Sequence, residues 1–413
     1  MEELRPESTP GTMILSSQLI SSLSFAVWFL AALNTATTYL WFQDEPKNGT
    51  AVSILSSCVM LVLVTLAMLI VGFRRNSGWP NPAKWIFVYC ALSGLSLSWT
   101  QASSLFSAAG YWIAFFADLL AVIILLSCDD VDRVALAAIK GFVAGTLVVA
   151  AIAWAAPGTP DLRMGQEEFL HPNALGFQFA LAALFGIYLA LRHRTTNHWR
   201  WISAALTSSL IRTLSKSSII SFFCSAGVYI LFQSALRLRT KLKIAGLAVI
   251  LLLTSWIFVA GYLQIYTESA ALETLTGRTT IWALSWEIAR ETPWIGHGFY
   301  SYRSVVPFFG EFEAWQAHND LLQQFFSYGI VGVLLAATIY VSFFRHLRGC
   351  RPSLQLSLTY ALLMFGLIHG LTEASHVDLA LPARLMVICA VWCEQSGPIS
   401  RSLHVLAPAA ATS

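Results

Sequence analysis

Basic and imidazole side chains gather in the segments between the long apolar runs of this sequence. Arg278 lies in "LTGRTTIW", His318 in "EAWQAHNDLLQQF", and Arg212 and Lys216 in "LIRTLSKSSIISF". Fixed cations bind and stabilise negative charge, and histidine is the side chain that most readily exchanges a proton near neutral pH. We therefore expect these groups, although far apart along the chain, to meet in one anion-binding pocket.

Arg212 and Lys216 flank a short break between two apolar runs. An ionisable side chain at membrane depth costs about 2.5 to 3.5 kcal/mol on insertion scales, so such a residue is usually functional or paired. Their i, i+4 spacing places both on one face if a continuous helix joins them. The alternative is that both side chains snorkel to phospholipid headgroups.

His318, Asn319 and Asp320 stand where an apolar run begins. The free N–H groups and the positive dipole end of the predicted helix point toward His318, which favours an anion site. The simpler interpretation is that Asn319 or Asp320 caps this helix and that His318 is a solvated interfacial residue.

Two further segments place polar groups at the ends of apolar runs. In "RMGQEEFLHPNALG", His171 and Asn173 flank Pro172, an acceptable first-turn residue; in "LIHGLTEASHVD", Glu373 follows an apolar run. His171 is either a ligand contact or a solvated loop residue. Glu373 is either a cap or ion-pair partner, or a base that faces the cavity.

The segment 263–324 is the longest that lacks a spanning run. Gly277 is expected to break the preceding structure and Thr279 to cap a new helix, which Pro293 ends. Ile281, Leu284 and Ile288 repeat at helical spacing beside a stripe that includes Trp282, which predicts an amphipathic helix on the membrane surface. The turn "WIGHGFYSYR" with His297 follows. The alternative is a re-entrant lid without chemistry.

These residues need a membrane fold to position them. The 413-residue chain is 56% hydrophobic and 11% charged, with a mean hydropathy of +0.65. Such values are typical of a polytopic membrane protein, and continuous apolar runs of about 20 residues select helices rather than a barrel. The sequence predicts an all-α membrane protein with about twelve transmembrane helices. They are placed near 17–41, 51–73, 84–100, 104–127, 134–156, 173–191, 200–215, 216–236, 243–262, 325–344, 354–372 and 379–394.

The loop charges predict the orientation. Lys and Arg in short loops stay cytoplasmic, and here they concentrate in the even-numbered loops. The N-terminus is then cytoplasmic, the first span is an uncleaved anchor, and the acidic segment 263–324 lies outside. We expect a single membrane domain over 1–413 that includes this loop as a lid, with a disordered tail at 395–413. The net charge of +3 reflects topology, and no nucleic-acid partner is indicated.

Three other groups of residues are of types that can take part in metal or redox chemistry. The seven cysteines lack CxxC spacing and are expected to pack within spans. "DDVD" at 129–132 has the spacing of metal ligands, but the topology places it in the cytoplasm, where an Asp N-cap explains it. "QDEPK", with Asp44 and Glu45, remains as a less favoured external metal site.

Taken in order, "HPNALG", "LSKSS", "LTGRTTIW", "PWIGHG", "AHNDLLQQFFSYGIVG" and "LTEAS" resemble the O-antigen ligase and polysaccharide polymerase superfamily of bacterial inner-membrane glycosyltransferases. The resemblance is closest to the exopolysaccharide-polymerase branch, and it covers roughly 165–375. It implies a helical fold of the GT-C type, whose periplasmic loop closes over a lipid-linked sugar. It also implies transfer of glycan from undecaprenyl pyrophosphate to an acceptor hydroxyl without a metal or other cofactor.

The resemblance assigns roles to particular residues. The family's loop arginine falls on Arg278 and its loop histidine on His318, while Lys216 stands where the ligases usually have arginine. This departure matters because lysine lacks the bidentate fork of arginine. The predicted catalytic residues are His318, Arg278 and Glu373. The pyrophosphate-binding residues are Lys216, Arg278, Arg212 and Arg303, and the substrate or lid residues are His171, Asn173, Trp282, His297 and Asn319.

The leading hypothesis is a polymerase acting by direct inverting displacement, in which basic groups stabilise the departing pyrophosphate and His318 or Glu373 removes the acceptor's proton. Its expected partners are the lipid-linked donor, a glycan acceptor, the bilayer and other polysaccharide assembly proteins. A ligase that transfers glycan to lipid A core, or to a protein, uses the same donor. From another class, a transporter or flippase also fits twelve spans, although no internal repeat is visible.

Overall fold

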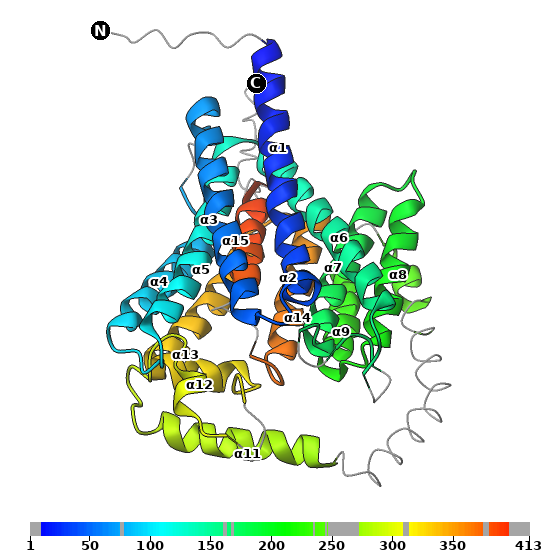
Figure 1. Cartoon of the computed structure of the whole chain (residues 1–413). Helices are drawn as coiled ribbons and strands as arrows, with labels where there is room; N and C mark the ends of the chain where they lie inside the picture. The colour runs from blue at the N-terminus through cyan, green and yellow to red at the C-terminus, as the bar shows by residue number, and fades with distance from the viewer. Residues whose placement is uncertain are drawn as a thin grey trace, which may run out of the picture.

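The computed structural model describes residues 10–74, 78–159, 163–166, 169–233, 236–243, 246, 272–308, 314–374 and 380–395. Over these residues the regular elements are all helices, and the β-type pairing is an isolated bridge between Gln166 and Leu170. Most helices run side by side in a bundle, and α11 lies across one end of it (Figure 1). The predicted all-helical class is confirmed for this part of the chain.

Helices occupy the predicted spans that fall within the described residues, and the span predicted at 243–262 lies outside them. The predicted tail lies outside them except for its first residue. The helices are α1 (Pro10–Leu33), η1 (Asn34–Ala36), α2 (Thr37–Trp41), α3 (Pro46–Val71), α4 (Asn81–Leu95), η2 (Ser96–Ser98), α5 (Leu105–Cys128), α6 (Val131–Ala155), α7 (Pro172–Arg192), α8 (His198–Arg212), α9 (Lys216–Phe232), α11 (Leu272–Ala289), α12 (Tyr302–Val305), α13 (Asp320–Arg348), α14 (Leu354–His369) and α15 (Ala380–Gln395).

Within the described residues, six helical segments are long and apolar enough to cross a membrane: 15–41, 47–71, 105–128, 131–155, 172–192 and 320–348. The helices α9 and α14 are apolar but shorter. Many large apolar side chains remain exposed, including Leu69, Ile70 and Phe106. Apolar helices with exposed apolar faces are expected where lipid rather than water surrounds the bundle.

Small residues bring the central helices close together. Gly141 and Gly145 of α6 are four residues apart, and a Cβ atom at either position would overlap the backbone of Phe25 or Phe29 in α1. This spacing lets two helix backbones approach closely, which is a common means of packing in membranes, where the hydrophobic effect does not drive association between helices.

The two ends of the bundle are each marked by a carboxylate. At one end, the start of α6, the end of α7, the start of α14 and the end of α15 meet around Asp132. At the other end, the start of α7 and the turn after α14 meet around Glu373. We refer to these as the Asp132 end and the Glu373 end.

A separate layer covers the Glu373 end. We define the lid as the described residues between 272 and 318, which comprise α11, the turn 290–301, α12 and the segment 314–318; α11 lies beneath the bundle in Figure 1. Its core is formed by Ile281 and Ala289 with Tyr302, Ala317 and Phe326, and the stripe of Ile281, Leu284 and Ile288 contributes to it.

The boundaries of α11 differ from those predicted. The helix begins at Leu272 and continues through Gly277 and Thr279, so the expected break and cap are wrong. It ends at Ala289, four residues before Pro293. An isolated glycine costs a helix only about 1 kcal/mol and is readily overridden by its context, whereas Pro293 limits only how far the helix can extend.

Candidate active site

Glu373 is the centre of the polar cluster at the Glu373 end. Its Oε1 accepts from Arg278 Nη2 at 2.7 Å and from Asn173 Nδ2 at 3.1 Å. Its Oε2 pairs with His318 Nδ1 at 2.8 Å and accepts from Gln316 Nε2 at 3.1 Å. The carboxylate is only 5% exposed, against 27% for the Arg278 side chain and 19% for that of His318. One polar group from α7, one from α11 and two from the segment 314–318 therefore converge on one buried anion.

These partners explain why a carboxylate can be buried here. Burial by itself raises the pKa of Glu373, but the hydrogen bond from His318 and the charges of His318 and Arg278 outweigh it, so the pKa is lowered from its ordinary value. Glu373 consequently remains ionised at neutral pH, and both of its oxygens are already engaged.

His318 has an unusual backbone. Its φ of 48° lies in the left-handed region, which costs a non-glycine residue of order 1 kcal/mol. Asn319 follows as the N-cap of α13 and accepts from Leu322 N–H at 3.0 Å. If the ring is neutral, donation from Nδ1 to Glu373 leaves Nε2 as the nitrogen that can accept a proton.

A second arginine reaches Glu373 through an amide. Arg163 Nη2 donates to Asn173 Oδ1 at 2.7 Å, and Asn173 donates from Nδ2 to Glu373. Arg163 Nε also donates to the carbonyl of Thr213 at 3.0 Å, which links the end of α8 to this group. His171 caps α7 by accepting from Asn173 N–H at 3.2 Å. The segment "HPN" thus forms the helix start that presents Asn173 to the carboxylate.

Lys216 is the first residue of α9, and this helix start is held at the Glu373 end. Ser215 Oγ donates to Ser218 Oγ at 3.0 Å, and Ser218 Oγ lies 3.3 Å from His369 Nε2 at the end of α14. Gly176 of α7 leaves room for Ser215, since a Cβ atom there would come within 2.7 Å of the serine Cβ. The motifs "LSKSS" and "HPNALG" therefore meet, and the exposed Lys216 lies beside them.

Four other predicted residues make different contacts. The guanidinium of Arg212 lies 5.9 Å from the ring of Trp154, and that of Arg303 lies 4.1 Å from the ring of Trp315. His297 is buried within the lid, and Trp282 is half-buried. Its indole N–H has no hydrogen-bond partner among the described residues.

The cluster contains residues that the sequence analysis did not single out: Arg163, Gln316, Ser218 and His369. A signal existed for Arg163, because it is a cation in an external loop of the predicted topology, as Arg212 and Lys216 are. Gln316 and His369 carry no comparable signal, since polar residues beside a helix end are common and only the tertiary contact distinguishes these two.

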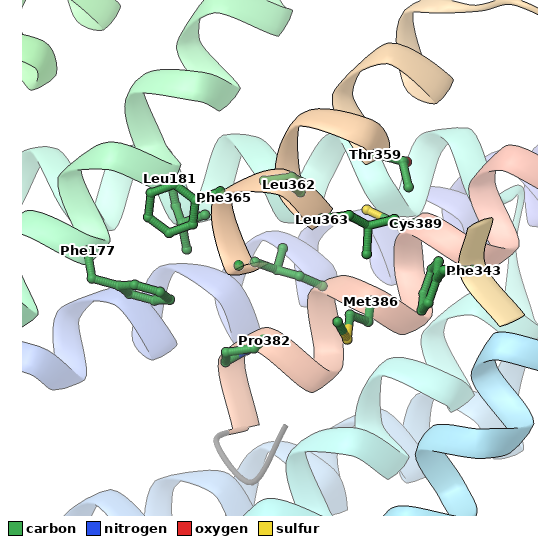
Figure 2. Close-up of a pocket in the computed structure, with 12 residues that line it drawn as sticks. Phe177, Leu181, Phe343, Thr359, Leu362, Leu363, Phe365, Pro382, Met386 and Cys389 are labelled. Carbon is green, nitrogen blue, oxygen red and sulfur yellow. The ribbon is translucent and has the colours of Figure 1, made fainter. Parts of the chain in front are cut away.

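An apolar pocket lies deeper in the bundle. Figure 2 shows side chains from α7, α13, α14 and α15 around it, among them Phe177, Phe365 and Met386. Phe177 and Phe365 also contact the ring of His369, with centroids 5.0 and 5.5 Å away. The pocket therefore extends toward the Glu373 end, but no charged side chain lines it.

The three aspartates of "DDVD" have other partners. An Asp N-cap was predicted here, and it is Asp130, which caps α6 by accepting from Arg133 N–H. Asp129 accepts from Ser17 Oγ at 2.6 Å, and Asp132 pairs with Arg192. Across the described residues, no three His, Cys, Asp or Glu side chains are grouped as metal ligands would be.

Comparison with known proteins finds similarity to the same family that the sequence motifs indicate. Residues 201–337 match the family model described as O-antigen ligase, and this range contains Lys216, Arg278 and His318. The chain is 25% identical over 308 residues to the exopolysaccharide production protein ExoQ of Rhizobium meliloti, an alignment that covers 68% of each chain. It is 35% identical over 115 residues to an O-antigen ligase of Pseudomonas aeruginosa, covering 28% of each chain.

The resemblance inferred from the motifs is thereby confirmed, and the helices described above agree with a membrane protein. The chain carries a domain of the O-antigen ligase family.

Proposed function

We propose that this protein is an inner-membrane glycosyltransferase that polymerises oligosaccharide units from an undecaprenyl-pyrophosphate-linked donor. The observation that supports this most strongly is the cluster in which Arg278, His318 and Asn173 surround the buried Glu373 beneath the lid. The O-antigen ligase match contains two of these residues, Arg278 and His318.

His318 is proposed as the general base. Its Nδ1 is held by Glu373, so Nε2 can remove the proton of an acceptor hydroxyl while the hydroxyl oxygen attacks the anomeric carbon of the donor. The bond from that carbon to the pyrophosphate oxygen breaks, and the configuration inverts. Glu373 orients the imidazole rather than acting as the base, because its oxygens already face four polar partners and its pKa is lowered.

The cations have a separate role. The departing pyrophosphate gains negative charge, which preorganised cations stabilise in a partly dehydrated site. Arg278 is tied to Glu373 through Nη2 and is 27% exposed, so it can approach a ligand while remaining fixed. Lys216 at the start of α9 is proposed as the second cation. Arg212 and Arg303 would have to leave their contacts with Trp154 and Trp315 to join it.

The topology is part of the proposal. We infer about twelve spans with a cytoplasmic N-terminus and a periplasmic Glu373 end beneath a periplasmic lid. Arg74 and Arg133 lie beside Asp129, and Arg192 pairs with Asp132, so basic residues gather at the Asp132 end. Positively charged ends of membrane bundles remain in the cytoplasm. The apolar pocket toward the Glu373 end is suitable for hydrocarbon and is proposed to accept part of the polyprenyl chain.

The acceptor distinguishes two versions of this function. ExoQ, aligned over 68% of each chain, is named for exopolysaccharide production and favours a polymerase. The local 35% identity to an O-antigen ligase keeps open a transfer to lipid A core. In cells, deletion of a polymerase removes long free polysaccharide and leaves the lipopolysaccharide ladder intact, whereas deletion of a ligase truncates that ladder.

Reconstitution tests the chemistry directly. The purified full-length protein in liposomes, given an undecaprenyl-pyrophosphate-linked oligosaccharide, is expected to form products longer by whole repeats and to release undecaprenyl pyrophosphate. Product length on gels and the released lipid by mass spectrometry provide the readout. Movement of intact donor across the bilayer without any cleavage would instead identify a flippase and refute the proposal.

A further inference from the structure

The helix α13 is interrupted where the lid contacts it. Gly329 has φ 61° and ψ −155°, which are not helical, so the run Asp320–Arg348 consists of a short helix up to Tyr328 and a long one from Ile330. In an uninterrupted helix, the N–H groups of Ile330 and Val331 would bond to the carbonyls of Phe326 and Ser327. The break leaves these four backbone groups without their usual helical partners.

The lid supplies new partners for all four groups. Ile330 N–H donates to Pro293 O at 2.8 Å and Val331 N–H to Trp294 O at 3.5 Å; His297 N–H donates to Phe326 O and Gly298 N–H to Ser327 O, each at 2.9 Å. Irregular backbone is tolerated in an apolar span only where protein or water satisfies it. The motif "PWIGHG" therefore completes the broken helix by backbone pairing.

This pairing requires glycine on both sides. Gly296 has φ 64° and Gly329 has φ 61°, both in the left-handed region that disfavours side chains. A Cβ atom at Gly296 would overlap the backbone at Ser327 and Tyr328, and one at Gly329 would overlap the backbone at Trp294 and Ile295. The two backbones approach closely only because neither position has a side chain.

The paired segment is also attached to α11. His297 is 2% exposed, and its Nε2 donates to the carbonyl of Ile288 at 3.1 Å. Its Nδ1 bonds to the side chain of Gln101 at 2.9 Å, and Gln101 N–H donates to the carbonyl of His297 at 2.9 Å. The helix that carries Arg278 is thus fixed to the turn that pairs with α13.

The short helix is held at its other end by the turn that carries Glu373. Asp320 N–H donates to Gly370 O at 2.8 Å, and Asn319 Nδ2 donates to Leu371 O at 3.1 Å. His318 directly precedes these two residues. The lid pairing fixes one end of this nine-residue helix and the Glu373 turn fixes the other, so both His318 and Arg278 depend on it for their positions.

We propose that Gly296 and Gly329 are positioning residues of the glycosyl-transfer site. They permit the lid to repair the break in α13, and this repair holds Arg278 and His318 on the same carboxylate. The reaction that this positioning serves rests on the proposed function, whereas the position of the lid can be measured without any reaction.

A pair of cysteines reports the position of the lid. Ser103 N–H donates to Ser304 Oγ at 2.8 Å, joining the connection before α5 to α12, and both residues are exposed and outside the site. In full-length protein carrying S103C and S304C, oxidative crosslinking measured by mass spectrometry is expected to be efficient. Adding Gly329→Ala should lower the crosslink yield at least about tenfold, since a misplacement of ~1 Å changes reactivity by up to ~100-fold.

Gly296→Ala tests the same pairing from the lid side. It replaces Gly329→Ala in both measurements if that variant does not accumulate in the membrane. Gly227→Ala is the matched control, because a Cβ atom there would meet nothing within 4 Å. In otherwise unmodified protein, both test variants should reduce transfer at least about tenfold, and the control should not.

Two readouts separate the possible failures. An unchanged crosslink yield in both Gly296→Ala and Gly329→Ala would overturn the positioning proposal. An efficient crosslink that both variants weaken, in a protein that transfers no glycan, would support the positioning and refute the proposed function instead.

Discussion

Two carboxylates at opposite ends of one bundle have partners of different kinds. Asp132 receives a bidentate pair from Arg192, at 3.2 and 2.7 Å, together with Trp392 Nε1 at 3.0 Å and Gln355 Nε2 at 3.4 Å. These donors come from the ends of α7, α15 and α14, so the contacts join bundle helices to one another. The Asp132 side chain is 33% exposed.

Glu373 makes as many contacts but joins two layers. Three of its partners, Arg278, Gln316 and His318, belong to the lid, and Asn173 belongs to the bundle. One of the lid partners is a histidine, a side chain that is often used for proton transfer in catalysis. The same number of polar contacts therefore joins bundle helices to one another at one end and, at the other, joins the lid to the bundle through a group that includes a histidine. This difference is our reason for placing the chemistry at the Glu373 end.

The largest expected effect tests the chemical role of His318. His318→Asn retains an amide donor for Glu373 and a residue that tolerates positive φ, but it removes the basic nitrogen. Transfer by the reconstituted protein should fall about 100-fold or more, as is typical when a general base is lost, while protein abundance stays normal. Transfer near the rate of the unmodified protein would show that His318 is not the base. The proposed chemical difference between the Asp132 end and the Glu373 end would then be lost.

The second prediction concerns acid. Because the pKa of Glu373 is lowered in the folded protein, the contacts of its carboxylate stabilise the fold at pH values above the ordinary carboxyl pKa. This stabilisation is lost as the pH falls through the lowered pKa. Acid also protonates cysteine thiols and slows crosslinking in any background, so the informative quantity is the yield of the S103C and S304C pair divided by its yield in the Glu373→Gln background. This ratio should be high and constant around neutral pH and fall toward one on strong acidification.

Arg192→Ala provides the control from the other end. This substitution should leave the shape of the curve of crosslink yield against pH unchanged. A curve that is identical in the unmodified and Glu373→Gln backgrounds would show that Glu373 does not hold the lid.

The smallest expected effect is on stability alone. Arg192→Ala should lower the free energy of unfolding by about 1 kcal/mol or less, because the Arg192 and Asp132 side chains are 26% and 33% exposed and water screens such a pair. Thermal unfolding in lipid nanodiscs measures this change, and transfer per folded molecule should be unaffected. A tenfold loss of transfer at normal stability would mean that the Asp132 end takes part in the reaction.

The sequence was informative where local chemistry decides structure. Apolar runs of membrane length predicted the helices, since backbone groups in lipid must bond within the segment. An N-cap at Asn319 or Asp320 and an Asp N-cap within "DDVD" followed from side-chain chemistry, and the structure has Asn319 and Asp130 in these positions. Conversely, the expected break at Gly277 was wrong because a single glycine costs a helix too little to end it.

The candidate site could be predicted only in part. Arg278, His318, Asn173 and Glu373 were each identified, but the expectation was an anion pocket formed by basic groups, and the convergence on the Glu373 carboxylate was visible only in the fold. Gln316 and Arg163 escaped notice because a polar residue at a loop end has no local signature of its partner. The break at Gly329 was equally invisible, since "SYGIVG" reads as a continuation of an apolar helix.

The sequence by itself determined that this chain forms apolar helices and carries the motifs of the O-antigen ligase family, because hydropathy and short motifs are properties of neighbouring residues. Only the tertiary structure decided which charges meet. The partners of Glu373 lie 55 to 200 positions away along the chain, and a distance of that kind is set by helix packing and by the lid's pairing with α13.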